Sequence, residues 1–84
     1  MNETISTFLF TNNGSSNITL IIEPWAEEFK MEPNDSVEIV GKGGNPHAQF
    51  EVEYLSDGLV VHGWEGSVVT VFKDGMELEP SLQT

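Results

Sequence analysis

Two histidines and the carboxylates near them in sequence are the residues best suited to metal chemistry. His47 and His62 are the only imidazoles of the chain, and Glu51 and Glu53 lie between them. Imidazole nitrogens and carboxylate oxygens can together hold a metal ion. The spacing matches no metal motif, since neither His-x-Glu-x-x-His nor a paired His-x-His is present. A structural role for His62 beside Trp64 is therefore the simpler interpretation, and we expect no bound metal or other cofactor.

The remaining polar residues offer little support for catalysis. The chain has no cysteine, and none of its serines lies in a Gly-x-Ser-x-Gly sequence, so the usual activated nucleophiles are absent. It has no arginine to clamp a phosphate or a carboxylate. Glu27 and Glu28 form an adjacent carboxylate pair, but such a pair is typical of a solvated bend. We therefore predict no catalytic residue.

The two tryptophans suggest ligand binding. Trp25 and Trp64 could each supply a flat apolar surface on which a sugar stacks, with nearby carboxylates available for Ca²⁺. A carbohydrate or Ca²⁺ binder is accordingly the second functional hypothesis. The alternative is that Trp64 fills a thin core together with Phe72. Trp25 is the better candidate, because it follows Pro24 in an irregular, acidic segment.

The charge of the chain restricts its partners. Fourteen Asp and Glu residues face three lysines, which gives a net charge of −11. This balance disfavours nucleic acids and anionic membranes, since both need cationic side chains to neutralise phosphate. It permits a basic protein partner, and that is the first hypothesis: a non-catalytic interaction protein with a binding surface at Glu27, Glu28, Glu32, Glu51 and Glu53. The alternative is that the charge only keeps the protein soluble.

Length and composition predict a single domain over residues 1–84. A chain of this size buries only a little over ~60% of the surface that its unfolded form exposes, so its core must be thin. The absence of cysteine removes disulfides and favours a reducing cytoplasm. No apolar run approaches the ~18 residues of a membrane span. We expect residues 1–6 and 80–84 to be flexible, and the oligomeric state is left open.

The first half of the chain reads as short strands separated by turns. Apolar residues alternate in the segments that we expect to be strands, and the residues between them favour turns. Asn13-Gly14 is a pair that type I′ turns prefer. Pro24 ends a strand because it has no amide hydrogen to donate. The expected strands are 7–11, 18–23, 29–31 at the end of a bend, and 36–41.

The sequence of the second half of the chain also predicts strands. In residues 47–54, Ala48, Phe50, Val52 and Tyr54 alternate with polar residues, which indicates a strand with one face in solvent. From residue 54 to residue 78, β-branched and aromatic runs are separated by Gly-containing turns. Such runs are typical of consecutive antiparallel strands, and we therefore expect a β-meander there.

Seven to eight short strands with no helix define an all-β class. That many strands in 84 residues must bring two apolar faces together, either as a small antiparallel β-sandwich or as a barrel. A jelly-roll-like sandwich is the preferred prediction.

Two resemblances bear on the fold. The turn from Pro33 to Val37 resembles the strand entry of cupin jelly rolls, and it suggests a cupin-like metal site at the two histidines as the third hypothesis. The chain from 19 to 78 also resembles small uncharacterised bacterial β proteins. The shared motifs are Glu-Pro-Trp at 23–25, Asp-Gly-Leu-x-Val-x-Gly-Trp-x-Gly-Ser at 57–67 and Asp-Gly-x-Glu-Leu at 74–78. The second resemblance implies a β fold and a bacterial origin, and no activity.

Overall fold

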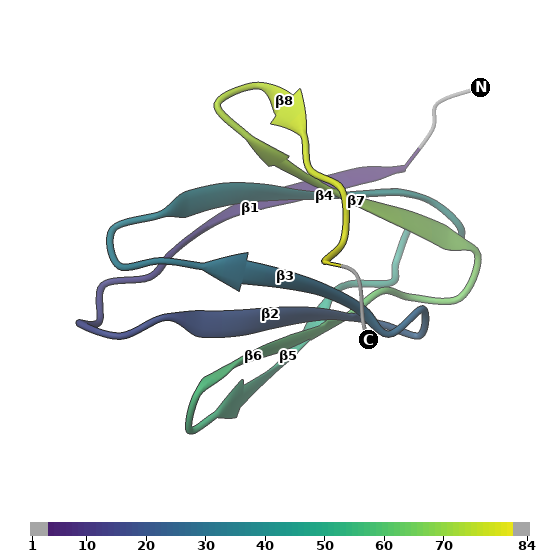
Figure 1. Ribbon diagram of the computed structural model, residues 1–84. Helices are drawn as coiled ribbons and strands as arrows, with labels where there is room; N and C mark the ends of the chain where they lie inside the picture. The colour runs from purple at the N-terminus through teal and green to yellow at the C-terminus, as the bar shows by residue number, and fades with distance from the viewer. Residues whose placement is uncertain (1–3, 82–84) are drawn as a thin grey trace.

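The protein is a β-sandwich of two four-stranded sheets (Figure 1). The computed structural model describes residues 4–81. Its strands are β1 (Ile5–Thr11), β2 (Ile18–Glu23), β3 (Glu27–Met31), β4 (Ser36–Gly43), β5 (Glu51–Leu55), β6 (Gly58–His62), β7 (Ser67–Lys73) and β8 (Met76–Glu77). The first sheet has the order β1-β4-β7-β8, and the second has the order β3-β2-β6-β5. The predicted all-β sandwich is confirmed, and the two sheets do not close into a barrel.

The core lies between the two sheets and follows from the alternation of side chains along each strand. Leu20 and Ile22 of β2 pair with Leu59 and Val61 of β6, and all four side chains are buried. The first sheet supplies the opposite wall with Ile39 and other apolar residues of β4 and β7. At ~1.5–3 kcal/mol per side chain, burial of these residues is the main term that holds the sheets together.

The segment between β1 and β2 crosses from one sheet to the other. β1 pairs with β4, whereas β2 pairs with β3 and β6. Asn13-Gly14 therefore does not join a hairpin, although its residue types favour one. The reason is Asn12, which is buried and tied to the turn between β3 and β4. The chain leaves the first sheet at that point and enters the second.

The expected meander over residues 54–78 is wrong. β5 and β6 form a hairpin, and so do β7 and β8, but β6 and β7 belong to different sheets. β6 instead pairs with β2, and the two strands are parallel. The connection from β6 to β7 bends around Trp64, whose carbonyl accepts hydrogen bonds from the backbone N–H and the hydroxyl of Ser67. With its side chain buried between the sheets, Trp64 turns the chain across the sandwich.

β5 is shorter and more exposed than the alternation predicts. It covers Glu51–Leu55 only, and all five of its residues are exposed. Val52 and Tyr54 do face the same side as the buried Val61 and Leu59 opposite them. They remain 48% and 85% exposed because β5 is the last strand of its sheet and has a neighbour on one side only.

Parts of both chain ends make backbone hydrogen bonds to neighbouring strands. Ile5 and Ser6 belong to β1 and pair with Lys42 and Gly41 of β4. At the other end, the Ser81 N–H donates to the carbonyl of Glu28 on β3 over 2.6 Å. Expected flexibility at residues 1–3 and 82–84 lies outside the described residues. Across residues 4–81, the structure has no helix of the length and apolar character that a membrane crossing requires.

Candidate functional site

The outer face of the second sheet carries most of the predicted site residues. The pairing of the strands places Glu51 beside His62, and Glu53 beside Val60. Both pairs point away from the core because Val61, between His62 and Val60, is buried. The same face continues across β2 and β3 through neighbouring residues in register. We call this surface the acidic face. It consists of Glu23, Glu28, Glu51 and Glu53 around Ile21, Val60 and His62, and its one lysine is Lys30 on the edge strand β3.

His62 is fixed to this surface by a carboxylate. Its Nε2 atom lies 2.5 Å from Oε1 of Glu53, diagonally across the β5–β6 pair. Both side chains of this contact remain partly exposed. Within residues 4–81, no group of three or more His, Cys, Asp or Glu side chains is arranged to hold a metal ion. The structure therefore joins His62 to one carboxylate only.

Trp25, His62 and Trp64 meet at one end of the second sheet. They line a cavity of about 360 Å³ that also contains Glu23 and Gly63. Trp64 is buried there, its indole N–H donates to the carbonyl of Gly43 over 2.7 Å, and its ring packs edge-on against Phe50. Trp64 is therefore buried as predicted, but its ring partner is Phe50. Phe72 alternates with the buried Val71 and lies on the outer face of β7, so the predicted pairing of Trp64 with Phe72 is wrong.

Trp25 has a different environment from Trp64. It follows the cis peptide bond between Glu23 and Pro24, lies over Gly63 and is 43% exposed. A side chain in this position can offer part of its ring face to a ligand or to a partner protein. The structure thus leaves one of the two predicted tryptophans accessible.

Two of the predicted carboxylates lie away from the acidic face. Glu27 pairs with the buried Ile22, so its side chain points to the inner side of the edge strand β3. Glu32 lies beyond the end of β3, in the turn before β4. The binding surface predicted from sequence is therefore divided, and Glu28, Glu51 and Glu53 are the members that share one face.

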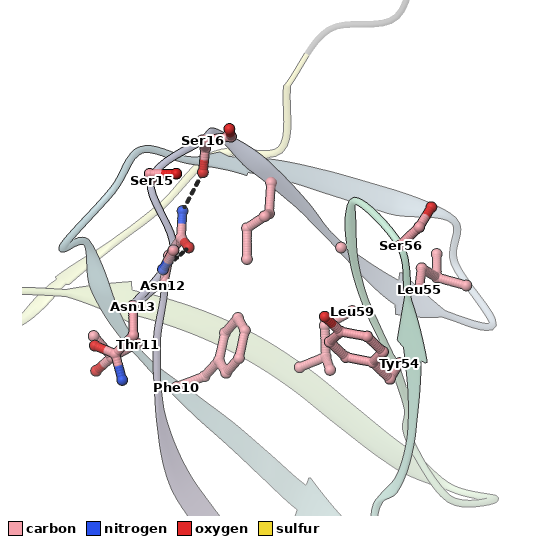
Figure 2. A pocket seen from close by; sticks show the side chains of 13 residues that line it. Phe10, Thr11, Asn12, Asn13, Ser15, Ser16, Tyr54, Leu55, Ser56 and Leu59 are labelled. Atoms are coloured by element: carbon pink, nitrogen blue, oxygen red, sulfur yellow. Dashed lines mark hydrogen bonds between the residues drawn. The ribbon is translucent and has the colours of Figure 1, made fainter.

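Sequence reasoning missed a second cavity, of about 400 Å³, at the open side of the sandwich. Its lining residues come from the end of β1, the loop after it, the start of β2 and the β5–β6 hairpin, and none of them carries a charge. In Figure 2, Phe10 and Leu59 face one another across the cavity, and Tyr54 lies at its rim. The alternation of β5 signals an apolar face, but only the structure shows that this face remains open.

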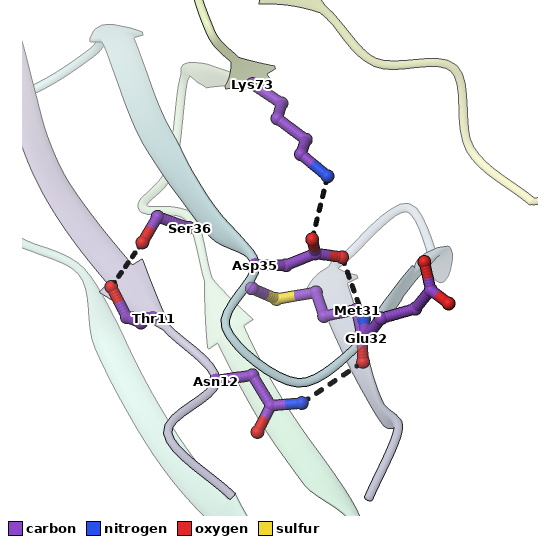
Figure 3. A network of polar contacts seen from close by, with 7 residues as sticks. All are labelled: Thr11, Asn12, Met31, Glu32, Asp35, Ser36 and Lys73. Atoms are coloured by element: carbon purple, nitrogen blue, oxygen red, sulfur yellow. Dashed lines mark hydrogen bonds and ion pairs between the residues drawn. The ribbon is translucent and has the colours of Figure 1, made fainter. Parts of the chain in front are cut away.

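Asn12 holds the loop that forms one wall of this cavity (Figures 2 and 3). Its side-chain N–H groups donate to the carbonyls of Ser16, over 3.0 Å, and Met31, over 3.2 Å. Its side-chain oxygen accepts from the backbone N–H of Gly14 over 3.0 Å. Both backbone groups of Asn12 are also paired, with Asn34 and Asp35. The buried amide thus joins the loop to β3, and the backbone of Asn12 joins it to the β3–β4 turn.

An ion pair extends this network to β7. Asp35 accepts a hydrogen bond from the Lys73 ammonium over 2.8 Å and another from the backbone N–H of Glu32 over 2.8 Å (Figure 3). The Lys73 hydrogen bond, followed by the Glu32 one, holds the pKa of Asp35 below its usual value. The same hydrogen bond to Asp35 raises the pKa of Lys73. The pair fixes the β3–β4 turn, against which Asn12 packs.

The Asp35–Lys73 pair makes stability depend on pH in a defined direction. Because the folded pKa of Asp35 lies below its unfolded value of about 3.9, its contribution is present above that value and is lost as pH falls through the folded pKa. Because the pKa of Lys73 is raised, its contribution is present below about pH 10 and is lost at higher pH. We expect Lys73→Met to lower the free energy of unfolding at neutral pH and to have no effect in strong acid.

Urea unfolding of both proteins from about pH 2 to about pH 7 measures this difference. A difference that stays constant down to the lowest pH would show that Lys73 acts through the packing of its aliphatic chain.

Comparison of the chain with known protein families, with curated proteins and with solved structures finds no match. The resemblance to small bacterial β proteins stays a prediction, and the functional argument rests on the geometry of the chain alone.

Proposed function

We propose that the protein is a non-catalytic interaction module that binds a basic protein segment on its acidic face. The observation that carries this proposal is the position of Glu51 and Glu53. Both project from an exposed edge strand, and their neighbours on the same face include the apolar side chains of Val60 and Ile21. A lysine or arginine chain that lies there can pair its charge with a carboxylate and pack its methylene groups on the apolar residues.

The charge of the whole chain supports the same kind of partner. A net charge of −11 attracts a cationic segment from a distance and repels anionic ones, which raises the rate of productive encounter. It also opposes association with nucleic acids and anionic lipids. The proposed setting is a bacterial cytoplasm, which suits a chain without cysteine.

A small-ligand binder at Trp25 ranks second. The accessible Trp25 ring above Gly63, with Glu23 in the same cavity, favours a stacked sugar or another flat ligand. Because Trp64 is buried, that site has one stacking surface rather than two. A cupin-like metal site at His47 and His62 is not proposed, since residues 4–81 contain no group of three or more His, Cys, Asp or Glu side chains arranged to hold a metal ion.

Binding of a fluorescent Lys-Gly repeat peptide tests the proposed function. We expect measurable affinity at about 20 mM NaCl that falls about tenfold at about 300 mM, because salt screens exposed charges. Replacing Glu51 and Glu53 together by Gln should weaken binding about fivefold, since exposed pairs contribute about 0.5 kcal/mol each. The matched control is the double replacement of Glu38 and Glu77 by Gln, which changes net charge equally on two exposed residues that flank Phe72 on the first sheet. An equal loss of affinity in both double variants would mean that peptide binding depends only on the total charge of the protein.

A further inference from the structure

The free edge of β5 is where the second sheet can be extended. β5 ends the strand order of its sheet, and all five of its residues are exposed. A strand in this position leaves backbone N–H and C=O groups available for pairing with another chain. The opposite edge, β3, is already contacted by the C-terminal segment through the bond from Ser81 to Glu28. The edges of the second sheet are therefore not equivalent, and β5 is the open one.

The open cavity lies at the C-terminal end of this edge, where Tyr54 and Leu55 belong to its lining. It is bounded by Phe10, Ile18 and Leu59 and by Tyr54 of β5 itself, and its lining carries no charge (Figure 2). A strand added to β5 would direct every second side chain toward this inner side, since side chains alternate along a strand. Apolar side chains there would cover Tyr54 and enter the cavity. The inner face of β5, which is exposed in the free protein, would then be covered.

The outer side of the same added strand would meet carboxylates. Glu51 and Glu53 are two residues apart on β5, so their side chains leave the strand about 7 Å apart on one face. Basic residues at every second position of the added strand match that spacing. Opposite charges on neighbouring strands stabilise their pairing, whereas like charges destabilise it.

From these observations we infer that the protein binds its partner by β-strand addition to β5, with a segment that alternates basic and apolar residues. The basic side chains pair with Glu51 and Glu53, and the apolar ones enter the 400 Å³ cavity. A second copy of this chain fits poorly, since two β5 strands side by side would bring their carboxylates together in a molecule of net charge −11. The edge strand β1 of the first sheet presents Ile5, Thr7 and Leu9 on its outer face and lacks the countercharge, and the other edge strand of that sheet, β8, has only two residues.

Because this docking mode rests on the proposed acidic-face function, its test compares two peptides of equal charge. One is Lys-Val-Lys-Val-Lys-Val-Lys, and the other replaces each Val by Gly. We expect the Lys-Val peptide to bind about tenfold more tightly by fluorescence anisotropy, because its valines leave water. Two N-methylated forms of the Lys-Val peptide test the backbone pairing, each with the N–H donors blocked along one of its two edges. We expect the form that is blocked on the edge facing β5 to lose the tighter binding, because the donors that pair with β5 are gone, and the other form to keep it.

Matched variants locate the contact on the protein. Tyr54→Ser removes the apolar rim of the cavity, and we expect it to weaken the Lys-Val peptide about fivefold and to leave the Lys-Gly peptide unchanged. Leu9→Ser is the control, because Leu9 is 73% exposed on the outer face of the first sheet. Both residues are exposed, so both variants should fold, and their melting temperatures verify this.

The outcomes separate the two proposals. Equal binding of both peptides, with loss on replacement of Glu51 and Glu53, would overturn strand addition and keep the acidic-face function. Binding of neither peptide, or binding that ignores Glu51 and Glu53, would overturn both. In that case the carboxylates of β5 only protect the edge against self-association.

Discussion

Replacing Asn12 by Ala should lower the free energy of unfolding by about 3 kcal/mol, because it leaves several groups without partners. The side chain is 3% exposed and satisfies the carbonyls of Ser16 and Met31 and the N–H of Gly14. Alanine cannot replace any of these bonds. For a chain of this length the total stability is roughly 4–13 kcal/mol, so the loss is a large fraction of it. Urea denaturation measures the change, and we expect the melting temperature to fall by roughly 12–24 °C.

The neighbouring Asn13 provides the control. It is exposed and has the same residue type, so Asn13→Ala should change stability by less than about 0.5 kcal/mol. If Asn12→Ala were as mild as Asn13→Ala, the amide of Asn12 would not hold the loop between the sheets.

Replacing Gly58 by Ala should cost about 2–3 kcal/mol, since the close approach of two backbones leaves no room for a side chain. Gly58 begins β6 and lies beside Thr19 in the parallel pair with β2. A β-carbon built on Gly58 would fall onto the carbonyl oxygen of Thr19, well inside van der Waals contact. Because that oxygen belongs to the backbone, β2 and β6 must separate to admit the methyl group. Thermal and urea unfolding measure the destabilisation.

Ser56→Ala in the same hairpin is the matched comparison, because Ser56 is exposed and its replacement adds no atoms. A stable Gly58→Ala variant would mean that the start of β6 can move away from β2 without loss. In that case the parallel pair would be less important to the sandwich than its central position suggests.

Alternation along single strands was the most informative sequence signal. Leu20 and Ile22 in β2, and Val37 and Ile39 in β4, alternate with their neighbours in segments that were predicted as strands, and all four are buried in the core. This works because a strand that packs on one side must repeat its apolar residues with a period of two. The class and the two-layer architecture follow from that pattern and the short spacing of turns.

Turn composition in the sequence did not predict which strands belong to the same sheet. Asn13-Gly14 and the glycines around Trp64 have the composition of hairpin turns, yet both segments connect the two sheets. Whether such a segment forms a hairpin or crosses between the sheets depends on the hydrogen-bond partner of a nearby buried residue. Asn12 binds Met31, and Trp64 binds Gly43, and each partner is about 20 residues away in sequence. Turn propensity contains no information about such contacts.

The candidate site was predicted in part. Glu51 and Glu53 were placed on the polar face of one strand, and the structure places them there. The opposite face of that strand was expected to be covered, and Tyr54 is instead at the rim of an open cavity. Whether an inner face is covered depends on the position of the strand in its sheet. That position is fixed by long-range pairing, in this case the pairing of β6 with β2.

Amide hydrogen exchange of the Lys-Val complex is the measurement that most directly tests whether the edge of β5 is the binding surface. At saturating peptide we expect exchange in residues 51–55 to slow by about tenfold or more at the amides that face the peptide, because they become hydrogen-bonded. Exchange in β1, an edge strand of the first sheet, should not change. Protection of β1 in place of β5, or a complex without any new protection, would contradict strand addition at the acidic edge.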